Sequence, residues 1–149
     1  MTKRSMPYWI LLVPVAAIGA GVAVLAALNP SIEAQTSPDN ADARLKTRRY
    51  QAALKDVRAS TLEIIPGLRK YGANWRLSES QTENEVRAEV PVFMFTDDLM
   101  VTLKEDGDST MVDVHSKTRF PGKSDLGENR RHILQLLAAL DEKFAPVEN

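Results

Sequence analysis

The sequence predicts an α+β fold: an antiparallel four-stranded meander with two helices packed on one face, preceded by a single N-terminal transmembrane helix. Three observations predict it: an uncharged apolar run near the N-terminus, several segments of alternating hydrophobicity, and a helical apolar pattern on either side of those segments. We divide the 149 residues into a stub and membrane anchor (1–28), a flexible linker (29–44) and an α+β domain (45–149).

The anchor is predicted from Tyr8 to Leu28, which are 21 residues without a charge. At about 1.5 Å of rise per residue, such a helix spans a hydrocarbon core of about 30 Å. A cleaved signal peptide is the alternative, although its apolar region usually has only about 7–15 residues. Gly21-Val22-Ala23 and Ile32-Glu33-Ala34 both have the small-x-small pattern of a cleavage site, so cleavage remains open.

The flanking charges predict the orientation of this anchor. Lys3 and Arg4 precede the apolar run, and the next basic residue is Arg44. The positive-inside rule therefore keeps the N-terminus in the cytoplasm and exports the C-terminal domain. In a Gram-negative cell this means a single-pass inner-membrane protein with a periplasmic domain. The absence of cysteine is compatible with that oxidising compartment.

A stripe of small residues follows one face of the anchor: Ala16, Ala20, Ala23 and Ala27. Small residues let two membrane helices approach closely, so this stripe is a candidate packing face for a partner helix. The alternative is that alanine is simply common in single-span anchors.

The segment after the anchor is polar. Asn29–Asp42 is rich in Pro, Ser, Asn and Asp and contains Ile32 as its one large apolar residue, which predicts a flexible linker. From about Leu45 a helical pattern begins, with Tyr50, Leu54 and Val57 on one face. Pro66-Gly67 is expected to end that helix.

Four strands are predicted next. They centre on Trp75 and Leu77, on Val86–Val92, on Leu99–Leu103 and on Val112–Ser116, each with a period of two. Pro91 lacks the backbone N–H that a central strand needs, so we expect a bulge or the end of pairing there. The segment Glu105-Asp106-Gly107-Asp108 predicts a hairpin turn of type I′.

The last element is a helix with one apolar stripe, made by Leu126, Ile133, Leu137, Leu140 and Phe144. Asp125 followed by Glu128 predicts a variant of the capping box, with Ser124 as an alternative cap. Pro146 is expected to end the helix.

Two segments of this domain, Phe95–Leu103 and His115–Ile133, resemble the bacterial and plastid family catalogued as domain of unknown function 1499. The positions that match the family pattern are Phe95, Asp97, Asp98, Ser116, Arg119, Gly122, Ser124, Asp125, Leu126, Gly127, Asn129 and Ile133. His115 and His132 stand where the family has arginine, Thr118 stands where it has serine, and Pro121 adds one residue. The resemblance covers about Tyr50 to Leu140 and implies no activity.

The polar positions of this motif are our candidate site. They are Asp97, Asp98, Ser116, Arg119, Gly122, Ser124, Asp125, Gly127, Asn129 and Arg130. One interpretation is an ion-pair network beneath the final helix, to which Asp113 would also belong. A second is an anion site at the helix start, clamped by Arg119, Lys123 and Arg130. The interpretation we favour is structural: Asp125 itself accepts the free N–H groups at the start of the helix.

Other chemistry finds little support in the sequence. Zero cysteines exclude thiol catalysis and disulfides, and a net charge of −1 argues against nucleic-acid binding. His115 and Ser116 are adjacent in a strand and point to opposite faces, so one cannot activate the other. Two histidines without ligand spacing predict no metal site, and no glycine pattern predicts a cofactor.

These observations predict a membrane-anchored periplasmic domain that acts as a non-enzymatic binding or complex-stabilising module. A lipid or small-molecule binding domain is the alternative, because a curved sheet with two helices close to a bilayer is suited to enclosing an apolar ligand. A hydrolase is a third and weaker hypothesis.

Overall fold

The computed structural model describes residues 20–24, 27, 31–119 and 124–147. The strands are β1 (Glu33–Gln35), β2 (Arg48–Tyr50), β3 (Arg69–Lys70), β4 (Ala73–Asn74), β5 (Arg76–Leu77), β6 (Glu85–Val92), β7 (Phe95–Asp106) and β8 (Ser109–Thr118). The helices are α2 (Leu54–Ile64) and α3 (Glu128–Lys143), with short 3-10 turns η1 (Ala43–Leu45) and η2 (Ile65–Gly67).

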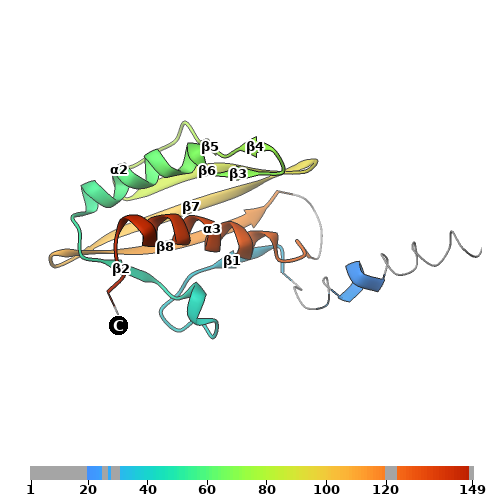
Figure 1. The fold of residues 1–149 in the computed structure, drawn as a ribbon, viewed down its shortest axis with the longest axis horizontal. Coiled ribbons are helices and arrows are strands. Elements are labelled where there is room, and N and C mark those ends of the chain that lie inside the picture. Colours follow the sequence, from blue (N-terminus) through green and yellow to red (C-terminus); the bar gives the residue numbers. More distant parts are fainter. Residues whose placement is uncertain (1–19, 25–26, 28–30, 120–123, 148–149) are drawn as a thin grey trace, which may run out of the picture.

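The sheet is antiparallel, and α2 and α3 cover the same face of it (Figure 1). The four predicted strands correspond to β5, β6, β7 and β8, which are neighbours in that order. Two further strands share the outer edge of β8: β1 pairs with residues 115–117, and β2 pairs with residues 110–112. The α+β prediction is therefore confirmed, with a sheet that is larger than the four-stranded meander expected.

The prediction of a flexible linker over residues 29–44 is wrong for the part that contains β1 and η1. Thr36, directly after β1, is buried, and its hydroxyl donates to Asp113 Oδ1 at 2.8 Å and accepts from the N–H of Val114. Backbone pairing along a strand edge requires no large apolar side chain. A polar composition therefore gave no sign that this segment belongs to the sheet.

The first helix starts at Leu54 and not at Leu45. Tyr50 lies in β2, where it is fully buried and its hydroxyl donates to Asp141 Oδ1 at 2.7 Å. The face defined by Leu54 and Val57 is buried as predicted, and the α-helix gives way to η2 around Pro66.

The strand pairing around Pro91 and the turn between β7 and β8 both differ from the sequence predictions. Pairing of β6 with β7 continues through Pro91, opposite Thr96, without a bulge. Since β5 pairs only with Ala88 and Glu89, Pro91 lies beyond that pairing, where proline is tolerated. In the other turn, Gly107 takes the first central position with φ of 67°, and Asp108 has no positive φ. This is the pattern of a type II′ turn, not type I′.

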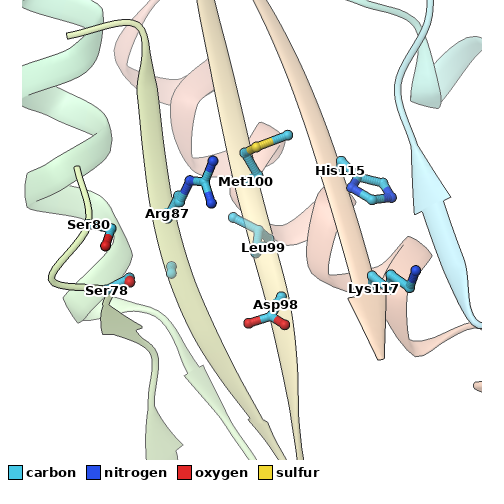
Figure 2. Close-up of a pocket in the computed structure, with 9 residues that line it drawn as sticks. Ser78, Ser80, Arg87, Asp98, Leu99, Met100, His115 and Lys117 are labelled. Carbon is cyan, nitrogen blue, oxygen red and sulfur yellow. The ribbon is translucent and has the colours of Figure 1, made fainter. Parts of the chain in front are cut away.

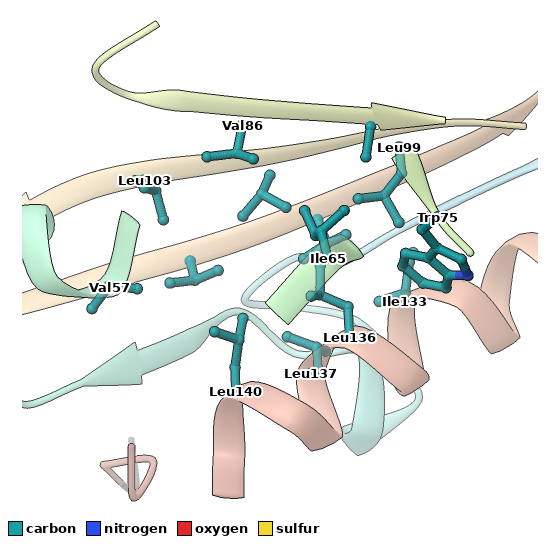
Figure 3. Close-up of a cluster of buried hydrophobic side chains, with 14 of the residues drawn as sticks. Val57, Ile65, Trp75, Val86, Leu99, Leu103, Ile133, Leu136, Leu137 and Leu140 are labelled. Atoms are coloured by element: carbon teal, nitrogen blue, oxygen red, sulfur yellow. The ribbon is translucent and has the colours of Figure 1, made fainter. Parts of the chain in front are cut away.

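The core lies between the sheet and the two helices (Figure 3). Alternate residues of the long strands point into it, among them Val86 of β6 and Leu99 and Leu103 of β7. The stripe on α3 is confirmed at Ile133, Leu137 and Leu140, which are completely or almost completely buried. This packing fixes which face of β7 and β8 points toward α3.

The predicted anchor falls mostly outside the described residues. Ala20, Ala23 and Ala27 are helical and exposed, whereas Ala16 is not among the residues described. Within the described part of the chain, no helix is long and apolar enough to cross a membrane.

Candidate functional site

Asp97 and Asp98 lie on opposite faces of the sheet because they are consecutive in β7. Asp97 points toward α3 and is only 1% exposed. Asp98 is exposed and accepts hydrogen bonds from Arg119, with Nε 3.0 Å from both carboxylate oxygens. Arg119 also donates to Glu89 Oε1 at 2.7 Å. The two aspartates therefore belong to different environments.

Asp97 is a buried carboxyl group with one satisfied oxygen. Its Oδ1 accepts from the hydroxyl of Thr118 at 2.5 Å. Its Oδ2 has no hydrogen-bond partner and lies 3.5 Å from His132 Nδ1. Burial raises the pKa of Asp97, and the nearby carboxylates of Asp125 and Glu128 raise it further, against the effect of Thr118.

His132 lies on the buried side of α3, between two carboxyl groups. Its Nδ1 faces Asp97, and its Nε2 lies 3.6 Å from Glu128 Oε2. The ring is completely buried and meets Trp75 edge-on, with 5.8 Å between ring centroids. Burial lowers the pKa of His132 to about 4, so the imidazole is neutral at pH 7.

Glu128 is surrounded by donors at the first turn of α3. Lys70 Nζ lies 2.9 Å from Oε2, while Arg131 and the Tyr71 hydroxyl donate to Oε1. Burial alone would raise the pKa of Glu128, but the hydrogen bonds from Arg131, Lys70 and Tyr71 outweigh it and lower the pKa to about 2. Glu128 therefore stays ionised, and its positive neighbours are already paired with it.

Asp125 accepts backbone N–H groups at the start of α3, as the structural interpretation predicted, but the N-cap residue of the helix is Gly127 and not Asp125. Asp125 Oδ1 accepts from the N–H of Gly127 at 2.8 Å, and its Oδ2 accepts from the N–H of Asn129 at 2.7 Å. The reciprocal half of a capping box is absent, because the N–H of Asp125 donates to the carbonyl of Ser31 and Glu128 binds other partners. Ser124 accepts from the N–H of Leu126, a smaller contribution to the same turn.

Ser116 and Asn129 join the sheet to this turn and are both fully buried. The Ser116 hydroxyl donates to Asn129 Oδ1 at 2.7 Å, and Asn129 Nδ2 donates to the carbonyl of Ile32 at 2.8 Å. These bonds hold the start of α3 against β8 and against the residue that leads into β1. A serine committed in this way is structural and is not exposed for nucleophilic attack.

The predicted single ion-pair network and the anion clamp are both wrong. Arg119 pairs with Asp98 and Glu89, while Arg130 pairs with Asp42 on another side of the domain. Asp113 accepts hydrogen bonds from Thr36 and Thr47. Strand alternation sends the consecutive Asp97 and Asp98 to opposite faces of the sheet, and Arg130 comes from α3, where it pairs with a residue before η1. Gly122 and Lys123 lie outside the described residues.

A groove of about 430 Å³ opens beside Asp97, between the β6–β7 hairpin and the start of α3. Its walls are mainly apolar and include Val92, Phe93, Phe95 and Leu126. Its polar lining includes Asp97, Thr118, Asp125 and Glu128. Apolar walls with a few convergent polar groups are the usual features of a small-molecule site.

Three residues on the rim of this groove have positive φ although none is glycine: Tyr71 (48°), Phe93 (45°) and Leu126 (56°). No other described non-glycine residue has this conformation. The left-handed region costs such residues about 1–2 kcal/mol each. Strain of this kind tends to gather at functional sites, so its confinement to one groove favours that groove as the site.

A second depression, of about 340 Å³, lies on the opposite, solvent-facing side of the sheet (Figure 2). It is lined by side chains such as Arg87, Asp98, His115 and Lys117. Among the described residues, none of the buried polar atoms without a partner belongs to this depression. It has no feature that distinguishes it from an ordinary charged sheet surface.

The sequence pattern did not point to two parts of this site, which are the apolar walls of the groove and the buried His132. The position of His132, four residues after Glu128, puts both side chains on one face of a helix and is the local signal that connects them. Tyr71 and Phe93 carry no local signal, because only folding brings them to the start of α3. The described residues contain no group of histidines and carboxylates arranged to hold a metal ion.

Comparison with known proteins places the chain in a family. No curated protein matches the chain. Among solved structures, it is similar to CalU16 from Micromonospora echinospora, with 14% identity over 72% of this chain and 83% of that one, and a TM-score of 0.44. It is also similar to TTHA0849 from Thermus thermophilus, with 10% identity over 74% of this chain and 95% of that one, and a TM-score of 0.34. The family described as "Protein of unknown function (DUF1499)" matches residues 22–140, and the chain therefore belongs to that family.

Proposed function

We propose that this protein is a membrane-anchored, non-enzymatic binding domain whose groove beside Asp97 takes a lipid or another apolar small molecule. The anchor would be the Tyr8–Leu28 segment, with the N-terminus in the cytoplasm and the domain in the periplasm. The observation that carries the proposal is the groove itself: apolar walls, a strained rim and a buried carboxyl group with a free oxygen.

The groove suggests the chemistry of its ligand. Its volume of about 430 Å³ suits a molecule of moderate size or one part of a lipid. Phe93, Phe95 and Val92 would contact an apolar portion. Asp97 Oδ2 lacks a donor, and leaving a buried acceptor unpaired costs about 1–3 kcal/mol. This oxygen is itself buried, so a ligand hydroxyl or ammonium group would remove that cost by displacing the side chains that cover Asp97.

The charge around the groove also favours a ligand group that donates hydrogen bonds over a ligand group that is anionic. The lining includes three acidic residues, Asp97, Asp125 and Glu128, and one basic residue, Arg131, which is already paired with Glu128. An anionic group at Asp97 would therefore meet repulsion. The partner-helix role of the alanine stripe remains a prediction beside this proposal.

The test is to identify the small molecules that co-purify with the full-length protein from its native membrane, by mass spectrometry of the extracted complex. Wild type is compared with Asp97→Asn and with Asp98→Asn, the neighbouring residue of the same type on the opposite face of the sheet. We expect one class of molecule to be retained by wild type and Asp98→Asn and to be depleted from Asp97→Asn.

A second variant guards against misfolding of Asp97→Asn. Phe95→Ser removes part of the apolar wall at a residue that is 40% exposed, so the core is left intact. It should also deplete the ligand. Equal retention by all four proteins, or no bound molecule in wild type, would contradict the proposal.

A further inference from the structure

We propose that the tip of the β6–β7 hairpin docks onto the membrane that anchors the chain, with Phe93 and Met94 inserted among the lipids. This inference rests on the proposed anchoring and goes beyond ligand binding, because it assigns a second contact between the domain and the bilayer.

The tip is the most apolar exposed surface of the domain. Phe93 is 85% exposed and Met94 is 75% exposed, and Phe95 is next to them at 40%. Tyr71, at 59%, lies across the groove, where its hydroxyl reaches Glu128. The other exposed large hydrophobic side chains among the described residues are Val22 and Val24, which belong to the predicted anchor. Large apolar residues gathered in this way mark an interaction surface.

The anchor enters the domain at the same end. The carbonyl of Ser31 accepts from the N–H of Asp125, and the carbonyl of Ile32 accepts from the N–H of Thr118. Asp125 in turn lines the groove together with Phe93. In Figure 1 the N-terminal helical residues, the start of α3 and the β6–β7 tip lie at one end of the sheet, and the β7–β8 turn lies at the other.

The length of the connection keeps this end close to the bilayer. Ser31 comes three residues after Leu28, the end of the predicted span, and three extended residues reach about 11 Å at most. Ser31 therefore lies within about 11 Å of the end of the predicted span, which keeps the end of the domain that contains Ser31 next to the bilayer.

The two hairpin tips differ in charge, as expected if the β6–β7 tip faces the membrane and the β7–β8 tip faces water. Val92-Phe93-Met94-Phe95 carries no charge, whereas Asp106-Gly107-Asp108 at the far end carries two acidic residues. Phe93 also holds a positive φ that glycine or asparagine would adopt more readily. A strained aromatic side chain exposed at a turn is better explained by a bilayer contact than by the stability of the turn.

The test uses the full-length chain reconstituted in phosphatidylcholine vesicles that contain some phosphatidylglycerol. Because the natural sequence has no cysteine, Met94→Cys provides a single site for an environment-sensitive fluorophore. Asp108→Cys, exposed in the opposite turn, is the matched control. We expect blue-shifted emission and quenching by nitroxide-labelled lipid chains at position 94 and a water-like signal at position 108.

Tyr71→Cys is a second reporter, at the other rim of the groove, in case labelling at position 94 disturbs the turn. It should give a partial blue shift and quenching by lipids labelled near the headgroup. Water-like signals at both 94 and 71 would overturn the inference, as would a blue shift at 94 that nitroxide lipids do not quench, since that would indicate contact with another protein. Either result could occur while Asp97→Asn still depletes a bound ligand, so the two proposals fail separately.

Discussion

At the scale of single residues, the motif at the start of α3 is mainly structural, and one buried carboxyl group near it has an oxygen without a hydrogen-bond partner. Asp125, Ser116 and Asn129 satisfy one another or the backbone, while Asp97 Oδ2 does not. Asp97 and Asp125 belong to the same motif, yet their surroundings give them different roles.

Asp125→Ala is expected to destabilise the domain, because the variant loses both backbone N–H bonds that start α3. Losing such a cap costs about 0.5–2 kcal/mol of unfolding free energy. On the usual scaling for about 100 residues, the melting temperature should fall by several degrees. Asp125→Asn should be milder, since asparagine also caps well. Thermal melting of residues 31–149 followed by circular dichroism would measure this, and unchanged melting of Asp125→Ala with lost binding would refute it.

His132 is expected to make the stability depend on pH between about 6.5 and 4. Its folded-state pKa of about 4 lies below its ordinary value of 6.5, so the unfolded chain takes up a proton first as the pH falls. The stabilisation is therefore fully present above pH 6.5 and is lost on acidification toward pH 4. The raised pKa of Asp97 acts in the opposite direction.

The measurement is the free energy of unfolding of residues 31–149 in urea at several pH values. His132→Gln, which cannot gain a charge, should show a smaller loss over this range than wild type. Identical slopes for the two proteins would show that His132 does not titrate as its burial implies.

At the scale of elements, the short strand β1 joins three parts of the domain. It pairs with β8, its neighbour Thr36 binds Asp113 and Val114, and Ile32 accepts from Asn129 and Thr118. Strands this short bury little apolar surface. They stabilise the domain mainly by forming hydrogen bonds with polar groups that the long elements leave without a partner.

A fragment that starts at residue 45, the boundary predicted from sequence, should therefore be less stable than one that starts at Ser31. It loses β1 and leaves the buried Asn129 amide without its carbonyl acceptor, at about 1–3 kcal/mol for each unsatisfied group. Comparing the melting temperatures of residues 31–149 and 45–149 tests this. Thr36→Val in the longer fragment should give an intermediate value, because it keeps the strand and removes only the hydroxyl bonds. Equal melting of all three would show that β1 is dispensable.

At the scale of the whole molecule, the groove, the apolar hairpin tip and the entry of the N-terminal segment lie at one end of the domain. Under the proposed anchoring, this arrangement would make the orientation of the chain in the membrane decisive for the proposed ligand binding. The fold is also relevant to signal-peptide cleavage, because cleavage after Ala34 would remove two of the three residues of β1.

We therefore expect a reporter that is active only in the periplasm to be active when fused after Asn149, and the protein to keep its full mass. The reason is the pair Lys3 and Arg4 before the apolar run and the absence of basic residues directly after it. Replacing both with glutamate is the control and should reduce export of the domain. Activity of a cytoplasm-only reporter at the same position would reverse the topology, and an N-terminus mapped near Gln35 would show cleavage.

The sequence by itself determined the elements whose apolar residues repeat with a regular period. The strands around Val86–Val92, Leu99–Leu103 and Val112–Ser116 and the stripe of α3 were predictable, because burial of one face imposes that period. The structural role of Asp125 was predictable, because its hydrogen bonds join residues that are neighbours in the chain, although the N-cap position itself is held by Gly127.

Only the tertiary structure decided the elements and the site that depend on distant partners. β1 and β2 form because the edge of β8 is available to them, and their own composition does not indicate it. The groove needs Tyr71, Phe93, Asp97 and Leu126 to meet at one end of the sheet, although they come from three separate segments. The spacing of apolar residues within one element reflects the burial of one of its faces. It does not indicate which other elements will pack beside that element.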